Sequence, residues 1–226
     1  MYQGIIFDFN GVLLWDNPQH EQVWKDVSKR LRGTPLSDEE IVQHVHGRTN
    51  PRILQYIMNN TLTPAEIARF SHEKEAQYRD VCLADMSNFH LSPGAVELLD
   101  FLAAHDIPRT IATASEKENV DFYIETLDLV RWFALEKIVY GDGTIRSKPA
   151  PDMYLKAAEH IGVPPEQCVV VEDSVSGMAA ARAAGAGHLI ALGEKEKHVQ
   201  LGQVEGVHRV VEHLGQIPRT LWREIS

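Results

Sequence analysis

The chain has 226 residues, a formal charge of −10 and a hydrophobic content of 44%, values typical of a soluble globular protein with one sizeable core and a smaller appended domain. No cluster of basic residues stands out, so we expect neither a nucleic acid nor an anionic membrane as a partner. We find no signal-peptide pattern and no apolar run of the ~18 residues that a membrane span needs, and Cys82 and Cys168 have no metal-ligand spacing. These features predict a cytoplasmic protein with reduced thiols.

The first predicted element is a short buried strand at residues 4–7, with the sequence Gly-Ile-Ile-Phe. Asp8 and Asn10 follow it directly, at the carboxyl end where open α/β sheets place their ligands. An ionised Asp at this position can attack as a nucleophile or hold a cation. Asn10 offers its carbonyl oxygen and its backbone, but its amide cannot take or give a proton.

A helical block follows, from about Pro18 to Met86, with apolar residues at helical spacing and no convincing strand. Within it, Thr63, Pro64 and Glu66 predict the start of a helix that runs toward residue 81. We predict an all-helical cap domain over residues 17–87, inserted after the first strand into a core formed by residues 1–16 and 88–226. An insertion at this point would hang over the carboxyl edge of the sheet as a lid.

From about residue 91 the predicted helices and strands alternate. The predicted helices cover residues 92–102, 115–127, 151–161 and 174–184, and the predicted strands cover residues 108–113, 137–140, 168–172 and 188–192. Ser115 and Glu118 have the spacing of a capping box for the second of these helices. The alternation predicts βαβ units and an α/β fold with a parallel sheet.

Polar residues follow several of these strands, and the parallel arrangement would bring them to one edge. Thr113 and Ser115 follow one strand, Glu172 and Asp173 follow another, and Lys148 precedes a helix. Taken singly, each has a structural explanation as a cap, a strand-end hydroxyl or a solvated lysine. Their joint placement beside Asp8 favours a phosphoryl-transfer site, because carboxylates suit Mg²⁺ while a lysine, hydroxyls and amides suit a phosphate.

Four segments in this order resemble the motifs of the haloacid dehalogenase superfamily, over nearly the whole chain. They are residues 7–13, residues 111–115, residues 147–152 (Ser-Lys-Pro-Ala-Pro-Asp) and residues 171–174 with Gly177. The chain is most similar to the capped phosphatases and phosphomutases of the β-phosphoglucomutase-like group. This resemblance implies a Rossmann-like core with a parallel sheet and an inserted helical cap.

The resemblance also implies roles for individual residues. Asp8 would be the nucleophile, Thr113 and Lys148 would bind the transferring phosphate with Ser115 nearby, and Mg²⁺ would be held by Asp8, the main-chain carbonyl of Asn10 and Asp173, with Glu172 close by. In the cap, His20 resembles the hinge-proximal histidine of the group, and Arg48 lies in a segment, residues 47–49, that resembles its substrate-facing loop. The resemblance makes both residues candidates for binding the substrate or its phosphate. A helix-surface histidine and a solvated arginine explain these two residues equally well.

The chain departs from the family pattern at Asn10, because the phosphatases and mutases have an Asp at this position. Proton transfer by such a residue increases the reaction rate roughly 10²–10⁴-fold. We expect a Mg²⁺-dependent phosphatase of a small phosphorylated metabolite that forms an aspartyl phosphate and is slowed or specialised by Asn10, with His20 as a candidate replacement for the acid. The alternative is a non-catalytic protein that binds or senses a phosphorylated ligand. A sugar-phosphate mutase is disfavoured, since it needs acid–base help in both half-reactions.

Other chemistries of the superfamily also lack an acid at this position. The predicted magnesium ligands argue against a dehalogenase, which uses no metal. A phosphonate hydrolase would need a cap lysine for a Schiff base, and Lys25, Lys29 and Lys74 are the candidates in the helical block. An Asn10 introduced by an experimenter also stays open, and the pattern decides neither the substrate nor the oligomeric state.

Overall fold

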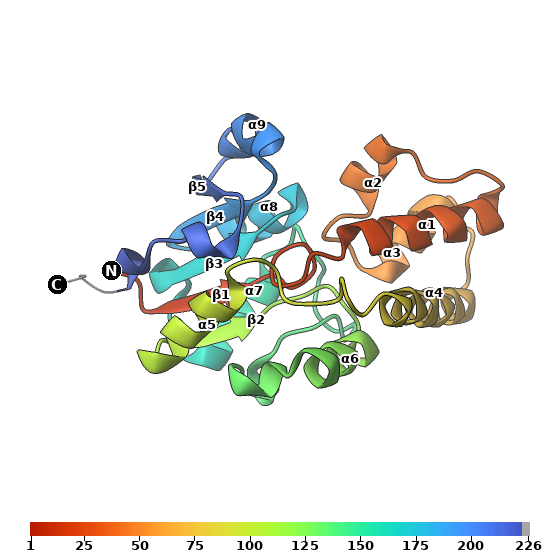
Figure 1. Cartoon of the computed structure of the whole chain (residues 1–226). Coiled ribbons are helices and arrows are strands. Elements are labelled where there is room, and N and C mark those ends of the chain that lie inside the picture. Colours follow the sequence, from red (N-terminus) through yellow and green to blue (C-terminus); the bar gives the residue numbers. More distant parts are fainter. Residues whose placement is uncertain (223–226) are drawn as a thin grey trace. The chain divides into compact units, whose positions relative to one another are not determined.

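The computed structural model describes residues 1–222 and divides the chain into two compact units (Figure 1). Among the described residues, one unit contains residues 1–15 and 91–222, and the other contains residues 16–90. These boundaries lie one to three residues from the predicted ones. No helix of the described residues is long and apolar enough to cross a membrane.

The first unit is built on a parallel five-stranded sheet with the order β2-β1-β3-β4-β5. The strands are β1 (Gly4–Phe7), β2 (Arg109–Ile111), β3 (Cys168–Glu172), β4 (His188–Leu192) and β5 (Val207–Val211). In register, Ile6 of β1 lies between Thr110 of β2 and Val170 of β3. Because all the strands are parallel, Asp8 and Glu172 emerge at the same edge of the sheet, as the sequence predicts.

Helices and short 3-10 turns connect these strands. The helices are α5 (Ala95–Ala104), α6 (Lys117–Leu127), α7 (Asp152–Ile161), α8 (Val175–Ala183) and α9 (His198–Gly202). The 3-10 turns are η1 (Leu129–Arg131), η2 (Leu135–Lys137), η3 (Pro165–Gln167), η4 (Lys195–Lys197), η5 (Leu214–Gln216) and η6 (Arg219–Leu221).

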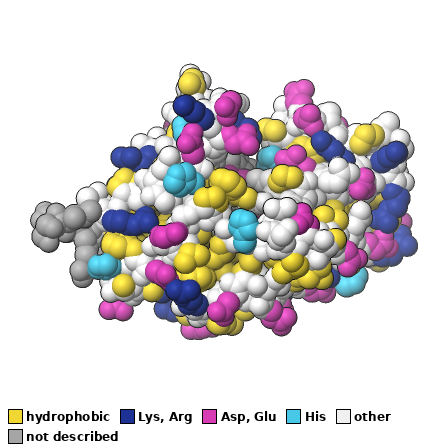
Figure 2. All heavy atoms as spheres, viewed as in Figure 1, with side chains coloured by type: hydrophobic (Ala, Val, Ile, Leu, Met, Phe, Trp, Pro, Cys, Tyr) yellow, Lys and Arg dark blue, Asp and Glu magenta, His cyan; other side chains and the backbone are white. Residues whose placement is uncertain are grey.

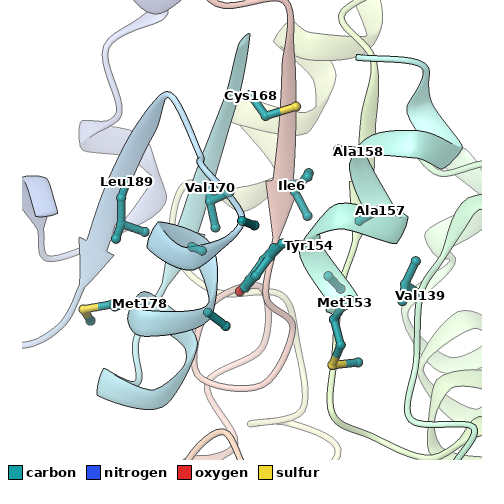
Figure 3. Close-up of a cluster of buried hydrophobic side chains, with 14 of the residues drawn as sticks. Ile6, Val139, Met153, Tyr154, Ala157, Ala158, Cys168, Val170, Met178 and Leu189 are labelled. Carbon is teal, nitrogen blue, oxygen red and sulfur yellow. The ribbon is translucent and has the colours of Figure 1, made fainter. Parts of the chain in front are cut away.

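A continuous apolar core joins α7 and α8 to one face of the sheet (Figure 3). Tyr154 of α7 points into this core beside Ile6 and Val170, and Met178 enters it from α8. The small residues of α8 include Ala180, which is fully buried, so the helix can pack close to the strands. The core therefore anchors the strand ends that carry the polar residues.

The second unit is entirely helical. Its helices are α1 (Asn17–Arg32), α2 (Asp38–His44), α3 (Asn50–Ile57) and α4 (Pro64–Ala84). The predicted start of α4 is correct, because Thr63 Oγ1 accepts from the Glu66 amide at 3.3 Å while the Glu66 carboxylate accepts from the Thr63 amide at 2.8 Å. The α1 residues Val23 and Trp24 are buried, and both α1 and α3 pack against α4.

Two predictions about local structure are wrong, and one strand was not predicted. Residues 137–140 do not form a strand: η2 overlaps their start, and only Val139 pairs with Ala112 in a single bridge. Ser115 does not cap α6, whose N-cap is Glu116 without a side-chain hydrogen bond. The strand β5 was not predicted, because this edge strand is half-exposed and carries histidine and arginine instead of a continuous apolar run.

Charged side chains of both signs lie on the face of the molecule that Figure 2 shows. On this face, lysine and arginine side chains are interspersed with aspartate and glutamate.

Candidate active site

Asp8 lies where β1 ends and the chain turns. The Asp8 amide donates to the Val171 carbonyl at 3.0 Å, which continues the β1–β3 ladder to the last residue before the turn. Gly11 then adopts a positive φ of 79°, a conformation that glycine takes without the steric cost that a Cβ imposes. The turn leaves the Asp8 carboxylate buried at the carboxyl edge of the sheet.

Lys148 joins two carboxylates that come from different strands. Its Nζ donates to Asp8 Oδ1 and to Glu172 Oε1, each at 2.5 Å. The Lys148 and Glu172 side chains are 0% exposed, and the Asp8 side chain is 11% exposed. Because buried carboxylates repel one another and lose their hydration, a cation between them is required for both to carry charge.

Every oxygen of Glu172 is engaged within the protein. Oε1 accepts from the Tyr154 hydroxyl at 2.7 Å as well as from Lys148. Oε2 accepts three bonds at 3.0 Å, from the Asp173 amide, the Ser174 amide and the Ser174 hydroxyl. Glu172 therefore orders the start of α8 and holds Lys148 in place.

Gly177 makes room for this carboxylate. A Cβ at residue 177 would collide with the Glu172 carboxylate, so a side chain cannot stand there without displacing it. The Gly177 amide also donates to the Ser174 hydroxyl at 3.0 Å, which is the N-cap bond of α8. The fourth sequence motif therefore needs a glycine at residue 177, because any larger side chain would collide with Glu172.

The protonation equilibria reflect this burial. Burial raises the pKa of the Asp8 carboxyl well above its ordinary value, and Lys148 opposes the shift. Burial would also raise the pKa of Glu172, but Lys148 and the surrounding donors outweigh it and lower that pKa. Burial would lower the pKa of Lys148, but the neighbouring carboxylates of Asp8 and Glu172 outweigh it and raise that pKa, so the side chain stays a charged ammonium. The pKa of the Tyr154 phenol is raised by burial and by Glu172.

An acidic cluster at this edge fits a hard cation. Carboxylate oxygens of Asp8, Glu172 and Asp173 lie within 4.8 Å of one another. Oxygen donors of this kind suit Mg²⁺, which takes one or two carboxylates and keeps several waters. A cation bound here would lower the pKa of Asp8, because an opposite charge favours the ionised carboxylate.

Thr113, Ser115 and Asn10 form a polar group beside this cluster. The Ser115 hydroxyl donates to Asn10 Oδ1 at 2.7 Å, and the Thr113 hydroxyl lies 3.4 Å from the same oxygen. The Ser115 amide donates to Thr113 Oγ1 at 3.1 Å. The Ser115 side chain is thus directed to Asn10, which explains why it does not cap α6.

Two tyrosines of the site were not predicted from the sequence. The Tyr123 hydroxyl accepts from Asn10 Nδ2 at 3.0 Å, and its ring stacks on Phe9 with centroids 4.5 Å apart. Tyr154 bonds Glu172 from within the apolar core, and its ring centroid lies 5.0 Å from Lys148 Nζ. Both occupy buried positions of predicted helices, where periodicity does not distinguish a packing residue from a functional one.

Comparisons with known proteins agree with this geometry. A sequence profile of the haloacid dehalogenase-like hydrolases matches residues 2–185. The chain belongs to this family. It is 30% identical to fructose-1-phosphate phosphatase YqaB of Escherichia coli over 186 residues, 81% of this chain and 93% of that protein. Several other curated relatives are also phosphatases of phosphorylated carbohydrates or metabolites.

Solved structures show the same architecture. A hydrolase of the family from Entamoeba histolytica has a TM-score of 0.86 and 37% identity, covering 97% of both chains. The D10N mutant of CbbY from Rhodobacter sphaeroides, in complex with xylulose-1,5-bisphosphate, has a TM-score of 0.78 at 23% identity and covers 96% of both chains. The expected Rossmann-like core with an inserted helical cap is therefore confirmed, and structural neighbours include β-phosphoglucomutases.

Within this haloacid dehalogenase-like hydrolase, the other two predicted site residues lie in the cap unit, residues 16–90. His20 stacks on Tyr78 with ring centroids 3.8 Å apart, and Lys74 Nζ lies 2.8 Å from His20 Nδ1. Because an ammonium can only donate, Nδ1 accepts and Nε2 carries the hydrogen, 3.2 Å from Asp16 Oδ2. Arg48 is half-buried in the same unit. The substrate-facing roles of His20 and Arg48 stay predictions.

The cap lysines also bear on the phosphonate hydrolase alternative. Lys74 is 1% exposed, whereas Lys25 and Lys29 are not buried. Lys74 Nζ lies 3.0 Å from Glu75 Oε1 in addition to its contact with His20. Lys74 therefore has two polar partners within residues 16–90, and the phosphonate hydrolase stays an untested alternative.

Proposed function

We propose that this hydrolase is a Mg²⁺-dependent phosphatase of a small phosphorylated metabolite and that Asp8 is its nucleophile. The observation that carries the proposal is the buried Asp8–Lys148–Glu172 cluster at the sheet edge, with Asp173 beside it. The curated phosphatases among its relatives support a phosphorylated sugar or a related metabolite as the substrate.

In the proposed reaction a carboxylate oxygen of Asp8 attacks the phosphorus, and the bond from phosphorus to the substrate oxygen breaks. Lys148 and the Thr113 hydroxyl bind oxygens of the transferring phosphoryl group and stabilise the charge that develops on them. Water then attacks the aspartyl phosphate, which releases phosphate and restores the Asp8 carboxylate. Mg²⁺, held by Asp8, Asp173 and the Asn10 main-chain carbonyl, would neutralise phosphate charge.

Asn10 supports a second candidate function. Its side chain is an amide and cannot exchange a proton with the leaving group or with water. A protein with this pocket and no proton carrier would bind phosphorylated ligands without turning them over. The mutase function stays disfavoured for the same reason.

The test is phosphate release from a panel of sugar phosphates and related phosphomonoesters, with Mg²⁺ and with EDTA. We expect Mg²⁺-dependent turnover of at least one ester, abolished by Asp8→Ala and unchanged in the control Asp121→Ala, whose carboxylate is 51% exposed on α6. Absence of turnover in the presence of measurable phosphate binding would contradict the phosphatase and favour the binding protein.

A further inference from the structure

Tyr154 carries a hydroxyl at a position where packing alone would need none. The residue lies on α7 among the apolar side chains that cover the sheet, and it is 1% exposed (Figure 3). A phenylalanine would fill nearly the same volume and would bury no polar atom that needs a partner. The hydroxyl donates to Glu172 Oε1 at 2.7 Å. It therefore acts on the carboxylate that holds Lys148.

Glu172 Oε1 is shared between this phenol and Lys148. Lys148 Nζ donates to Oε1 at 2.5 Å and to Asp8 Oδ1 at the same distance. A carboxylate oxygen has two lone pairs, so the phenol and the ammonium together fill its acceptor capacity. The other oxygen of Glu172 accepts its bonds from the start of α8. The phenol therefore limits how strongly Glu172 attracts the ammonium.

The ring of Tyr154 also faces the ammonium. Lys148 Nζ lies 5.0 Å from the ring centroid, within the range of a cation–π interaction. Both side chains are buried, so bulk water does not weaken these contacts. The hydroxyl and the ring thus act on one ammonium from the same helix, which the apolar core holds against the sheet.

We propose that Tyr154 is a positioning residue that keeps Lys148 Nζ between Glu172 and the nucleophile Asp8; the proposal rests on the phosphatase function proposed above. Without the hydroxyl, a lone pair of the buried Glu172 carboxylate would lose its donor, and the ammonium is a donor that already lies beside it. Lys148 would then move toward Glu172 and away from Asp8. The phosphate that Lys148 binds in the proposed reaction would lose part of that contact.

The experiment compares Tyr154→Phe with the unsubstituted protein, because phenylalanine keeps the ring and removes only the hydroxyl. The dissociation constant of inorganic phosphate is measured by isothermal titration calorimetry with Mg²⁺ present, and kcat and KM are measured on the best ester of the phosphate-release panel. We expect the dissociation constant and KM to rise about tenfold, which is the scale of one hydrogen bond to a charged group. In a crystal structure of the variant, Lys148 Nζ should remain on Glu172 Oε1 and lie beyond hydrogen-bond distance of Asp8 Oδ1.

Ile161→Val is the matched control, because Ile161 is buried on the same helix and the substitution removes one methylene from the same apolar core. Removal of a residue that only stabilises the fold lowers the fraction of folded enzyme. The apparent kcat then falls, while KM and the affinity for phosphate stay the same. We therefore expect the control to leave KM and the phosphate dissociation constant within twofold of the unsubstituted values.

Three results would overturn the positioning role and leave the phosphatase intact. They are a phosphate dissociation constant within twofold of the unsubstituted value in Tyr154→Phe, a Lys148 Nζ that still bonds both carboxylates in that variant, and an equal rise in Ile161→Val. Absence of turnover by the unsubstituted protein would overturn the phosphatase, and the phosphate titration would still decide the role of Tyr154. Absence of both turnover and phosphate binding would overturn both proposals.

Discussion

Removal of Lys148 should destabilise the core strongly, because its ammonium is the cation between two buried carboxylates. The side chains of Lys148 and Glu172 are 0% exposed, and Nζ lies 2.5 Å from an oxygen of each carboxylate. In Lys148→Met, Asp8 and Glu172 would share a buried site without their cation. Breaking a buried ion pair in this way costs about 3–5 kcal/mol, so we expect the free energy of unfolding to fall by that amount at pH 7.

The pH dependence of this loss follows from the carboxylates. In the unsubstituted protein the pKa of Glu172 is lowered, so its contribution to stability is present above its unfolded pKa and is lost as the pH falls through the folded pKa. Without Lys148, burial would raise the pKa of Glu172, and the carboxyl would take up a proton as the pH falls. The difference in stability between Lys148→Met and the unsubstituted protein should therefore shrink from pH 7 toward pH 5.

Urea unfolding in EDTA, followed by circular dichroism at both pH values, measures these differences. Lys156→Met is the matched control, because the Lys156 side chain is 40% exposed and lies 3.9 Å from Asp142; we expect it to cost less than about 1 kcal/mol. A loss below 1 kcal/mol in Lys148→Met at pH 7, or one that grows as the pH falls, would refute the reasoning.

Three further predictions concern other parts of the core. Asn10→Asp should raise kcat for a phosphomonoester by up to about 10²-fold, because a carboxyl at residue 10 can exchange the proton that an amide cannot. A phosphate-release assay that shows no gain would mean that residue 10 does not limit turnover. Gly177→Ala should destabilise the protein by about 1–3 kcal/mol in urea unfolding, because its Cβ would displace Glu172, whereas Gly202→Ala, whose Cβ meets an ordinary contact at 3.8 Å, should cause no loss. Burial, with nearby positive charge, lowers the pKa of His188 to about 4. Between about pH 6.5 and pH 4 the unfolded chain therefore takes up a proton on this ring that the folded protein does not, and the free energy of unfolding falls as the pH is lowered. After solvent screening we expect a loss of about 1–2 kcal/mol between pH 7 and pH 4 that is absent in His188→Gln, and an unchanged pH dependence in that variant would contradict this assignment.

Local patterns of the amino-acid sequence were sufficient to predict several elements of this fold. The apolar runs that form β1, β3 and β4 are continuous because these strands are buried in the sheet. Likewise, the capping box at Thr63 and Glu66 depends on residues three positions apart. The order and spacing of the motifs were sufficient to predict the family and its helical insertion, which the comparisons confirm.

Tertiary structure decided which polar residues meet and what each of them bonds. Lys148 bonds Asp8, which lies 140 positions away in the sequence. The two carboxylate oxygens of Glu172 accept hydrogen bonds from Lys148, from Tyr154 and from the start of α8. Ser115 has the spacing of a helix cap, but its hydroxyl is directed toward Asn10 Oδ1, to which it donates. Tyr123 shows no local signal, because a buried tyrosine of a helix looks like any core residue until packing brings its hydroxyl to Asn10. Local patterns are set by neighbours in the chain, whereas the chemistry at this sheet edge is set by packing between distant segments.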